Sequence, residues 1–246
     1  MALLKDKVVI ITGGANGMGA SHVRRCAAEG AQVVFGDIEV EPGRALAEEL
    51  GDAVRFVEHN VCDESGWATL VSTAGDVFGG VDALVNNAAI HWNRPVAEED
   101  AASMRKLFEV NVIGPTLGLQ AVLPAMRQRG GGSVINISSL AGIRGIPGYT
   151  AYGGSKWALR GLTQIWAREL GLDNIRVNSI MPGAIDETGM FQEGVDPEVD
   201  KQVIAAIPLG RTGKPVEVSN VVVFLVSDHS AYLTGTEQVL DGGHRT

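Results

Sequence analysis

A tyrosine and a lysine stand four residues apart, as Tyr152 and Lys156, in a segment with helical character. On a helix this spacing brings both side chains to one face. A free tyrosine has a pKa of about 10 and is a poor proton acceptor at neutral pH. A neighbouring ammonium favours the phenolate. The pair therefore indicates acid–base chemistry on a hydroxyl or carbonyl group, and the alternative for the pair taken alone is an exposed amphipathic helix.

A glycine-rich stretch, TGGANGMG at 12–19, joins the first apolar run to a helical pattern. Gly13 permits a sharp turn, Gly17 permits close approach of the backbone to a pyrophosphate, and Gly19 lets the helix pack against the sheet. The free N–H groups and the positive end of the helix dipole would then hold the phosphates. The stretch predicts a dinucleotide-binding loop.

An acidic residue, Asp37, follows the last of these glycines by 18 positions and ends the second apolar run. A carboxylate there accepts hydrogen bonds from the adenosine ribose and repels a 2′-phosphate. No lysine or arginine stands at 15, 16 or 38. The sequence therefore predicts NAD(H) rather than NADP(H), with an ordinary surface aspartate in a turn as the alternative.

Short apolar runs alternate with longer helical patterns along the chain. Strands are predicted at 8–11, 32–35, 54–57, 83–85, 134–137, 175–180 and 238–240. Helices are predicted at 17–29, 40–50, 64–79, 98–129, 151–171 and 215–227. Because the runs are continuous rather than alternating, both faces of each strand are buried, as in a parallel sheet between helices. The predicted fold is α/β, a single doubly wound parallel seven-stranded sheet of Rossmann type with helices on both faces.

We expect one dinucleotide-binding oxidoreductase domain over residues 1–246. The segment 183–214 breaks the strand–helix rhythm with several glycines and prolines. Long connections in compact domains are usually functional. We interpret this one as a substrate lid, with a plain surface loop as the alternative.

The chain resembles the short-chain dehydrogenase/reductase family. The glycine pattern TGxxxGxG begins at Thr12, NNAA follows at 86–89, and YxGSK lies at 152–156. Asn111, Ser138-Ser139 and Pro182-Gly183 keep the family's order and spacing, and the resemblance spans nearly the whole chain. Within the family it is most similar to bacterial 3α/20β-hydroxysteroid dehydrogenase-like enzymes.

This resemblance implies a catalytic set of Asn111, Ser139, Tyr152 and Lys156. Ser139 would donate to the substrate oxygen, Lys156 would hold the nicotinamide ribose, and Asn111 would support a water-linked proton relay; Ser138 is expected to bond backbone instead. The implied cofactor contacts are Gly13, Asn16, Gly17, Met18, Gly19, Asp37, Ile38, Asn60, Val61, Asn87, Tyr152, Lys156, Ile185 and Thr188.

Several positions depart from the family pattern. Ala89 replaces a glycine, Gly154 replaces an alanine, and Asn60 stands where an aspartate usually contacts adenine. An amide carbonyl can still accept from the adenine amino group. Thr188 comes one position later than the family's threonine, which weakens its assignment.

The predicted walls of the substrate pocket are mostly apolar. They are His91, Trp92, Leu140, Ile146, Pro147, Tyr149, Met181, Met190 and Phe191. Arg94 and Arg144 are the exceptions and are interpreted as surface residues. An apolar secondary alcohol or ketone, with a steroid or terpenoid-like ring as one form, fits these walls better than a phosphorylated sugar.

Composition and charge limit the binding partners and the cellular compartment that we expect for this protein. A net charge of −9 disfavours nucleic acid and anionic membranes, and no apolar run reaches the roughly 20 residues of a membrane span. The start lacks a secretory signal, and Cys26 and Cys62 are isolated, which favours the cytoplasm. The five histidines lack metal-ligand spacing, so no metal site is predicted.

Two helical stretches, 103–129 and 150–171, carry apolar residues on more than one face. The resemblance implies that they pair in a homotetramer, and the alternative is a monomer in which they pack only on the sheet. Two other functions stay open beside an NAD-dependent alcohol dehydrogenase or ketone reductase. One is a catalytically silent NAD(H)-binding sensor, and the other is an NADP-dependent 3-ketoacyl-thioester reductase.

Overall fold

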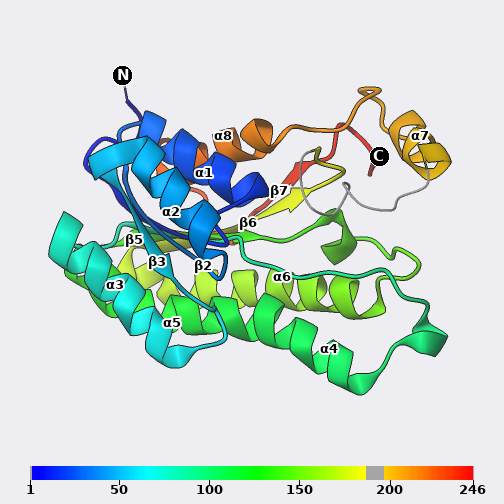
Figure 1. Ribbon diagram of the computed structural model, residues 1–246, viewed down its shortest axis with the longest axis horizontal. Helices are drawn as coiled ribbons and strands as arrows, with labels where there is room; N and C mark the ends of the chain where they lie inside the picture. Colours follow the sequence, from blue (N-terminus) through cyan, green and yellow to red (C-terminus); the bar gives the residue numbers. More distant parts are fainter. Residues whose placement is uncertain (1, 187–196, 246) are drawn as a thin grey trace.

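The computed structural model describes residues 2–186 and 197–245 (Figure 1). Seven parallel strands form one sheet with the order β3-β2-β1-β4-β5-β6-β7. The strands are β1 Val8–Thr12, β2 Gln32–Asp37, β3 Val54–Glu58, β4 Ala83–Asn86, β5 Gly132–Ile137, β6 Ile175–Pro182 and β7 Glu237–Leu240. The strand order reverses between β1 and β4, and such a switch point opens a crevice at the carboxyl ends of the strands. The predicted fold class is confirmed.

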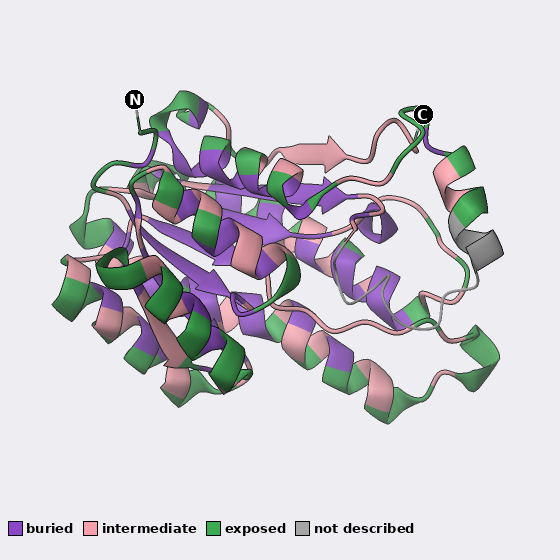
Figure 2. Ribbon diagram, turned by 45° about the horizontal axis from the view of Figure 1, so that its top comes forward, coloured by how far each residue is buried: buried purple, intermediate pink, exposed green. Residues whose placement is uncertain are grey.

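Helices cover both faces of the sheet (Figure 1). One face carries α1 Gly17–Ala28, α2 Val40–Leu50 and α8 Pro215–Val226, and the other carries α3 Glu64–Phe78, α5 Gly114–Gln128 and α6 Thr150–Leu170. Alternate residues of β1 belong to different apolar clusters, Val9 and Ile11 to one and Val8 and Ile10 to the other. The central strands are therefore buried on both sides, the edge strands β3 and β7 only in part, and the helices alternate buried and exposed residues (Figure 2).

The helix predicted at 98–129 differs from the structure at two points. It begins at Ala101 because the Asp100 carboxylate caps the backbone N–H groups of Ala102 and Ser103. It is also interrupted, since α4 Ala101–Phe108 leads into a π-helical turn at Glu109–Ile113 before α5 begins. A π turn is rare and often marks a functional site.

Taken together, α4, the π turn and α5 form one helical segment, Ala101–Gln128, which has the length and apolar composition that a membrane crossing needs. Core helices pass the same test. Leu119, Val122 and Met126 are buried in the apolar cluster between α5 and the sheet. Packing within the fold therefore accounts for the apolar character of α5.

The two ends of the segment predicted as a lid are hydrogen-bonded to each other. Ile185 and Gly213 form a parallel bridge, in which Asp186 N donates to Gly213 O and Gly213 N donates to Ala184 O, both at 2.9 Å. Helix α7, Pro197–Ala205, follows within the segment. Thr188, Met190 and Phe191 lie outside the described residues, so the lid stays a prediction.

Candidate active site

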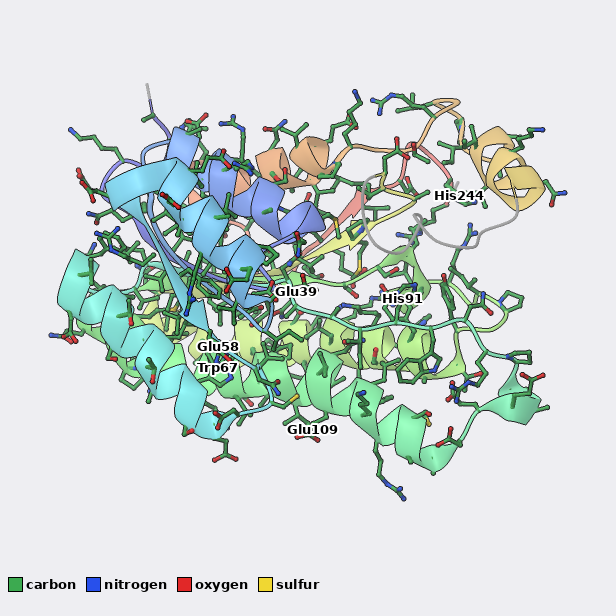
Figure 3. The ribbon with its side chains drawn as sticks, viewed as in Figure 1. Glu39, Glu58, Trp67, His91, Glu109 and His244 are labelled. Atoms are coloured by element: carbon green, nitrogen blue, oxygen red, sulfur yellow. The ribbon has the colours of Figure 1, made fainter. Side chains whose placement is uncertain are left out.

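A cleft of about 580 Å³ opens at the carboxyl ends of the central strands. Most of the predicted cofactor contacts line it: Gly13, Asn16, Gly17, Met18, Gly19, Asp37, Ile38, Asn60, Val61, Asn87, Tyr152 and Lys156. Figure 3 labels Glu39 and His91, which line opposite ends of this cleft. Residues that sequence reasoning did not assign to cofactor also contribute: Glu39, His59, Ala88, Ala89, Ile90, His91, Val110, Ile137 and Ser138. All of these except Val110, which lies in the π turn, follow or flank predicted strand ends, and that position is the signal that points to them.

The glycine loop leaves space that larger residues would fill. Gly13 and Gly17 have φ of +63° and +52°, a region that favours glycine. A Cβ at Gly19 would overlap the carbonyl oxygen of Gly13. The N-cap residue of α1, Asn16, makes no side-chain cap to the first-turn N–H groups. A helix N-terminus with uncapped N–H groups fits a pyrophosphate.

Asp37 at the end of β2 is fixed by two backbone donors. Its Oδ2 accepts from Ala15 N at 2.9 Å and its Oδ1 from Glu39 N at 3.0 Å. Glu39 adds a second carboxylate, which accepts from Asn16 Nδ2 at 2.7 Å. Among the described residues that line the cleft, Lys156 is the one basic side chain, and it belongs to the other end. The end beside Asp37 is therefore acidic and suits ribose hydroxyls.

Asn87 ties the glycine loop to the end of β4. Its Nδ2 donates to the carbonyls of Thr12 and Gly13 at 3.0 and 2.9 Å. The Thr12 hydroxyl accepts from the backbone N–H groups of Asn87 and Ala88, each at 3.1 Å. The Asn87 side chain therefore supports the loop from within, and its backbone lines the cleft.

Asn60, the predicted adenine contact, lies in a turn after β3. Its Oδ1 accepts from Cys62 N at 3.0 Å. An amide oxygen has two lone pairs, so one can still accept from an adenine amino group.

Tyr152, Lys156 and Ser139 come together as expected. Both α6 side chains are buried, and Lys156 Nζ lies 5.7 Å from the Tyr152 ring centroid. Ser139 follows β5, and its hydroxyl hydrogen-bonds the Tyr152 phenol. The Ser138 hydroxyl instead donates to the Lys156 carbonyl at 3.1 Å, as expected of a backbone-bonding serine.

The expected effect of the ammonium on the phenol is not found. Burial raises the pKa of Tyr152 to about 12, and the hydrogen bond from Ser139 only opposes that rise. Burial lowers the pKa of Lys156 to about 8. The reason is that desolvation disfavours both charged forms, while Lys156 Nζ donates to Ile137 O at 2.8 Å. This corrects the sequence-based interpretation, because these residues alone do not make Tyr152 more acidic.

Asn111 is fully buried in the π turn. Its Oδ1 accepts from Ile90 N and its Nδ2 donates to Ile90 O, both at 2.9 Å. Nδ2 also donates to the Ser155 hydroxyl at 3.1 Å, which in turn donates to the Tyr152 carbonyl at 2.7 Å. Asn111 therefore fixes the connection after β4 against the helix that carries Tyr152.

Aromatic rings gather at the Tyr152 end of the cleft. The Tyr149 and His91 ring centroids lie 5.3 and 5.8 Å from that of Tyr152, both edge-on. Trp92, Ile146 and Tyr149 are partly buried in one small cluster with Tyr152. An open cavity of about 690 Å³, lined in part by Ile146, Pro147 and Tyr149, lies alongside.

Other predicted wall and contact residues lie elsewhere. Leu140 and Met181 are buried, and Met190, Phe191 and Thr188 fall outside the described residues. Ile185 lines a separate cavity of about 180 Å³ beside Gly213 and is not brought into the cleft. Arg94 pairs with Glu99 and Asp100. Arg144 donates to the carbonyl of His244 at 3.2 Å.

Comparison with known proteins agrees with this geometry. A family model described as Enoyl-(Acyl carrier protein) reductase matches residues 13–245. A 3-alpha-(or 20-beta)-hydroxysteroid dehydrogenase from Mycobacterium bovis is 46% identical over 98% of this chain and 90% of its own length. A trans-4-hydroxycyclohexanecarboxylate dehydrogenase from Sinomonas cyclohexanicum is 41% identical over 97% of this chain and 92% of its own length. A cyclopentanol dehydrogenase from Comamonas is 40% identical over 99% of this chain and 99% of its own length. The chain belongs to the short-chain dehydrogenase/reductase family of oxidoreductases.

Proposed function

We propose that this protein interconverts an apolar cyclic secondary alcohol and its ketone with NAD⁺ and NADH. The observation that carries the proposal is one cleft lined by the glycine loop and Asp37 at one end and by Tyr152 and Lys156 at the other. Cofactor binding and proton transfer are thereby joined on one surface.

NAD(H) is proposed over NADP(H) because of the charges around Asp37. Both carboxylate oxygens are held by backbone N–H groups, and Glu39 adds a second negative charge close by. A 2′-phosphate would meet two carboxylates and no cation among the described residues at that end of the cleft. Ribose hydroxyls would instead find acceptors already oriented.

The chain's own residues would handle the proton. Ser139 would donate a hydrogen bond to the substrate oxygen, and the Tyr152 phenolate would take the hydroxyl proton in oxidation and return it in reduction. When bound, the oxidised nicotinamide supplies a positive charge and accepts the hydride from the carbinol carbon. The alcohol thus loses one hydride and one proton and becomes the ketone. Because burial raises the pKa of Tyr152, we propose that oxidation accelerates with rising pH.

Lys156 and Asn111 would support the proton transfer without taking part in it directly. The buried Lys156 ammonium lies on the same face of α6 as the phenol, which suits a role in holding the nicotinamide ribose. Asn111 would position the proton path through Ile90 and Ser155.

An alicyclic substrate fits the aromatic walls near Tyr152. The named activities of the three relatives are toward hydroxysteroids, a hydroxycyclohexane carboxylate and cyclopentanol, and we extend the ring-alcohol part of this chemistry to the present protein. We also propose a cytoplasmic homotetramer. Leu159 and Trp166 are buried in the core, but Trp157 and Ile165 on α6 are 47% and 52% exposed, as a helix pairing across subunits requires.

The test offers cyclohexanol, cyclopentanol and a 3α-hydroxysteroid in turn. The formation of NADH at saturating NAD⁺ is measured for each alcohol, and the formation of NADPH at saturating NADP⁺ is measured beside it. We expect turnover with NAD⁺ and a much lower rate with NADP⁺. Tight NADH binding without turnover of any alcohol or ketone would favour the silent sensor. Tighter NADPH binding with turnover of 3-ketoacyl thioesters would favour the acyl-thioester reductase.

A further inference from the structure

His91 has ring nitrogens that make no hydrogen bond within the described part of the chain. It lies in the connection after β4 and is half-buried at the Tyr152 end of the cleft. Its ring stands edge-on to Tyr152 with 5.8 Å between centroids. No hydrogen bond joins its nitrogens to any residue that the structure describes, although an imidazole offers a donor and an acceptor.

The other polar side chains around His91 are already engaged. Trp92 Nε1 donates to Glu99 at 3.1 Å, and Arg94 pairs with Glu99 and Asp100. Ser139 and Tyr152 hydrogen-bond each other where the reacting oxygen would sit. The Tyr149 hydroxyl has no partner among the described side chains, but Tyr149 lines the neighbouring open cavity rather than this cleft.

Burial lowers the pKa of His91 below its usual value, which favours the neutral imidazole. A neutral imidazole in an apolar setting both donates and accepts, and it recognises a hydroxyl or carbonyl better than it does an anion. Leaving such a group unpaired when a substrate expels water is costly, so the site favours substrates that supply a partner.

We propose that His91 is a specificity-determining residue that hydrogen-bonds a second oxygen of the substrate, carried on the same ring as the reacting carbinol. The inference rests on the proposed function. The short separation from Tyr152 limits the reach of His91 to about one ring, which favours ring diols and hydroxyketones over ring alcohols with a single hydroxyl.

The test compares kcat/KM for cyclohexane-1,4-diol and cyclohexanol with NAD⁺. A neutral hydrogen bond contributes about 0.5–1.5 kcal/mol, so we expect the intact protein to prefer the diol by up to about tenfold per hydroxyl group, counting both hydroxyls of the diol. His91→Phe keeps a ring against Tyr152 but removes both nitrogens, and the preference per hydroxyl group should fall to about one. His91→Gln restores a donor and an acceptor and should recover part of it.

His229→Phe is the matched control, because it makes the same replacement at an exposed histidine that does not line the cleft. The diol preference should survive this change. An unchanged preference in a folded His91→Phe variant that still oxidises cyclohexanol would overturn the role of His91 and leave the proposed function intact. If the intact protein oxidises neither alcohol, nor any other member of the panel, the proposed function fails and the role of His91 falls with it.

Discussion

The two ends of the cleft are built in different ways. At the coenzyme end, the loop between β1 and α1 and the end of β2 are held by short hydrogen bonds to backbone groups, from Ala15 N to Asp37 and from Asn87 to Gly13. At the substrate end, Tyr149 and His91 meet Tyr152 through ring edges. Under the proposed function, the first end would bind the coenzyme, which does not vary, largely through the main chain, and the second would bind the substrate through side chains.

This difference explains why the glycine loop accepts few residue types, whereas the ring contacts made by residues 91 and 149 accept many. Glycine at 13 or 19 is required by sterics, because a Cβ would meet Ala88 or the Gly13 carbonyl. A ring contact such as that between His91 and Tyr152 tolerates many residue types. Changes at the coenzyme end should therefore affect binding of every substrate alike, whereas changes at the substrate end should affect turnover or selectivity.

The largest expected effect is a loss of turnover caused by a change at the substrate end. Tyr152→Phe removes the phenol oxygen and leaves the ring that packs against Tyr149. General acid–base groups contribute about 10²–10⁴ in rate, and we expect kcat to fall about 10³-fold. NADH affinity, measured by fluorescence titration, should change by less than about threefold. If kcat falls less than about tenfold, Tyr152 is not the proton-transfer group.

Gly19→Ala tests the coenzyme end. The added Cβ would overlap Gly13 O and crowd Asn87 Nδ2, so the loop must open and NADH affinity should weaken about 10²-fold. Titration of NADH fluorescence measures this change. Gly161→Ala is the control, because Gly161 on α6 has open space around its Cβ position, and it should bind NADH as the native protein does. Equal affinities in both variants would contradict close packing at Gly19.

The elements and the coenzyme end could be predicted because their signals are local. Continuous apolar runs predict doubly buried strands, and a positive φ at Gly13 and Gly17 follows from the turn that the loop must make.

What the sequence could not provide depends on distant contacts. The π turn at Glu109–Ile113 has no local signature, and it becomes intelligible only when Asn111 is seen bonding Ile90 and Ser155. The pKa of Tyr152 was predicted from the nearby charge of Lys156, whereas burial, which sequence spacing does not reveal, outweighs that charge.

A smaller effect, on the preference for NAD⁺ over NADP⁺, is expected from Asp37→Asn at the coenzyme end. The substitution removes one negative charge but keeps the shape of the side chain, so repulsion of a 2′-phosphate weakens. We expect the ratio of kcat/KM for NAD⁺ over NADP⁺ to fall about tenfold. Glu41→Gln, on the exposed face of α2 and outside the cleft, should leave the ratio unchanged. A ratio equally unaffected by Asp37→Asn would show that its charge does not select the coenzyme.

The smallest effect concerns the stability of the helix behind the glycine loop. His22 on α1 is fully buried, and its Nδ1 lies 2.8 Å from the Ser219 hydroxyl of α8. The Ser219 hydroxyl also donates to Pro215 O at 3.0 Å. His22 Nε2 has no partner among the described residues, and burial lowers the pKa of His22 from 6.5 to about 3.

This pKa gives the sign of the pH dependence. Above pH 6.5 His22 is neutral in both folded and unfolded chains, and as the pH falls from 6.5 toward 3 only the unfolded chain gains the proton, so stability is lost. His22→Asn should cost about 1–2 kcal/mol at pH 7 but lower the slope of unfolding free energy against pH by up to about 1.4 kcal/mol per unit in that window. Urea unfolding at several pH values measures both quantities. His229→Asn, a change at an exposed histidine, is the control and should leave the slope of unfolding free energy against pH unchanged. If His22→Asn also leaves this slope unchanged, unfolding does not involve proton uptake by His22.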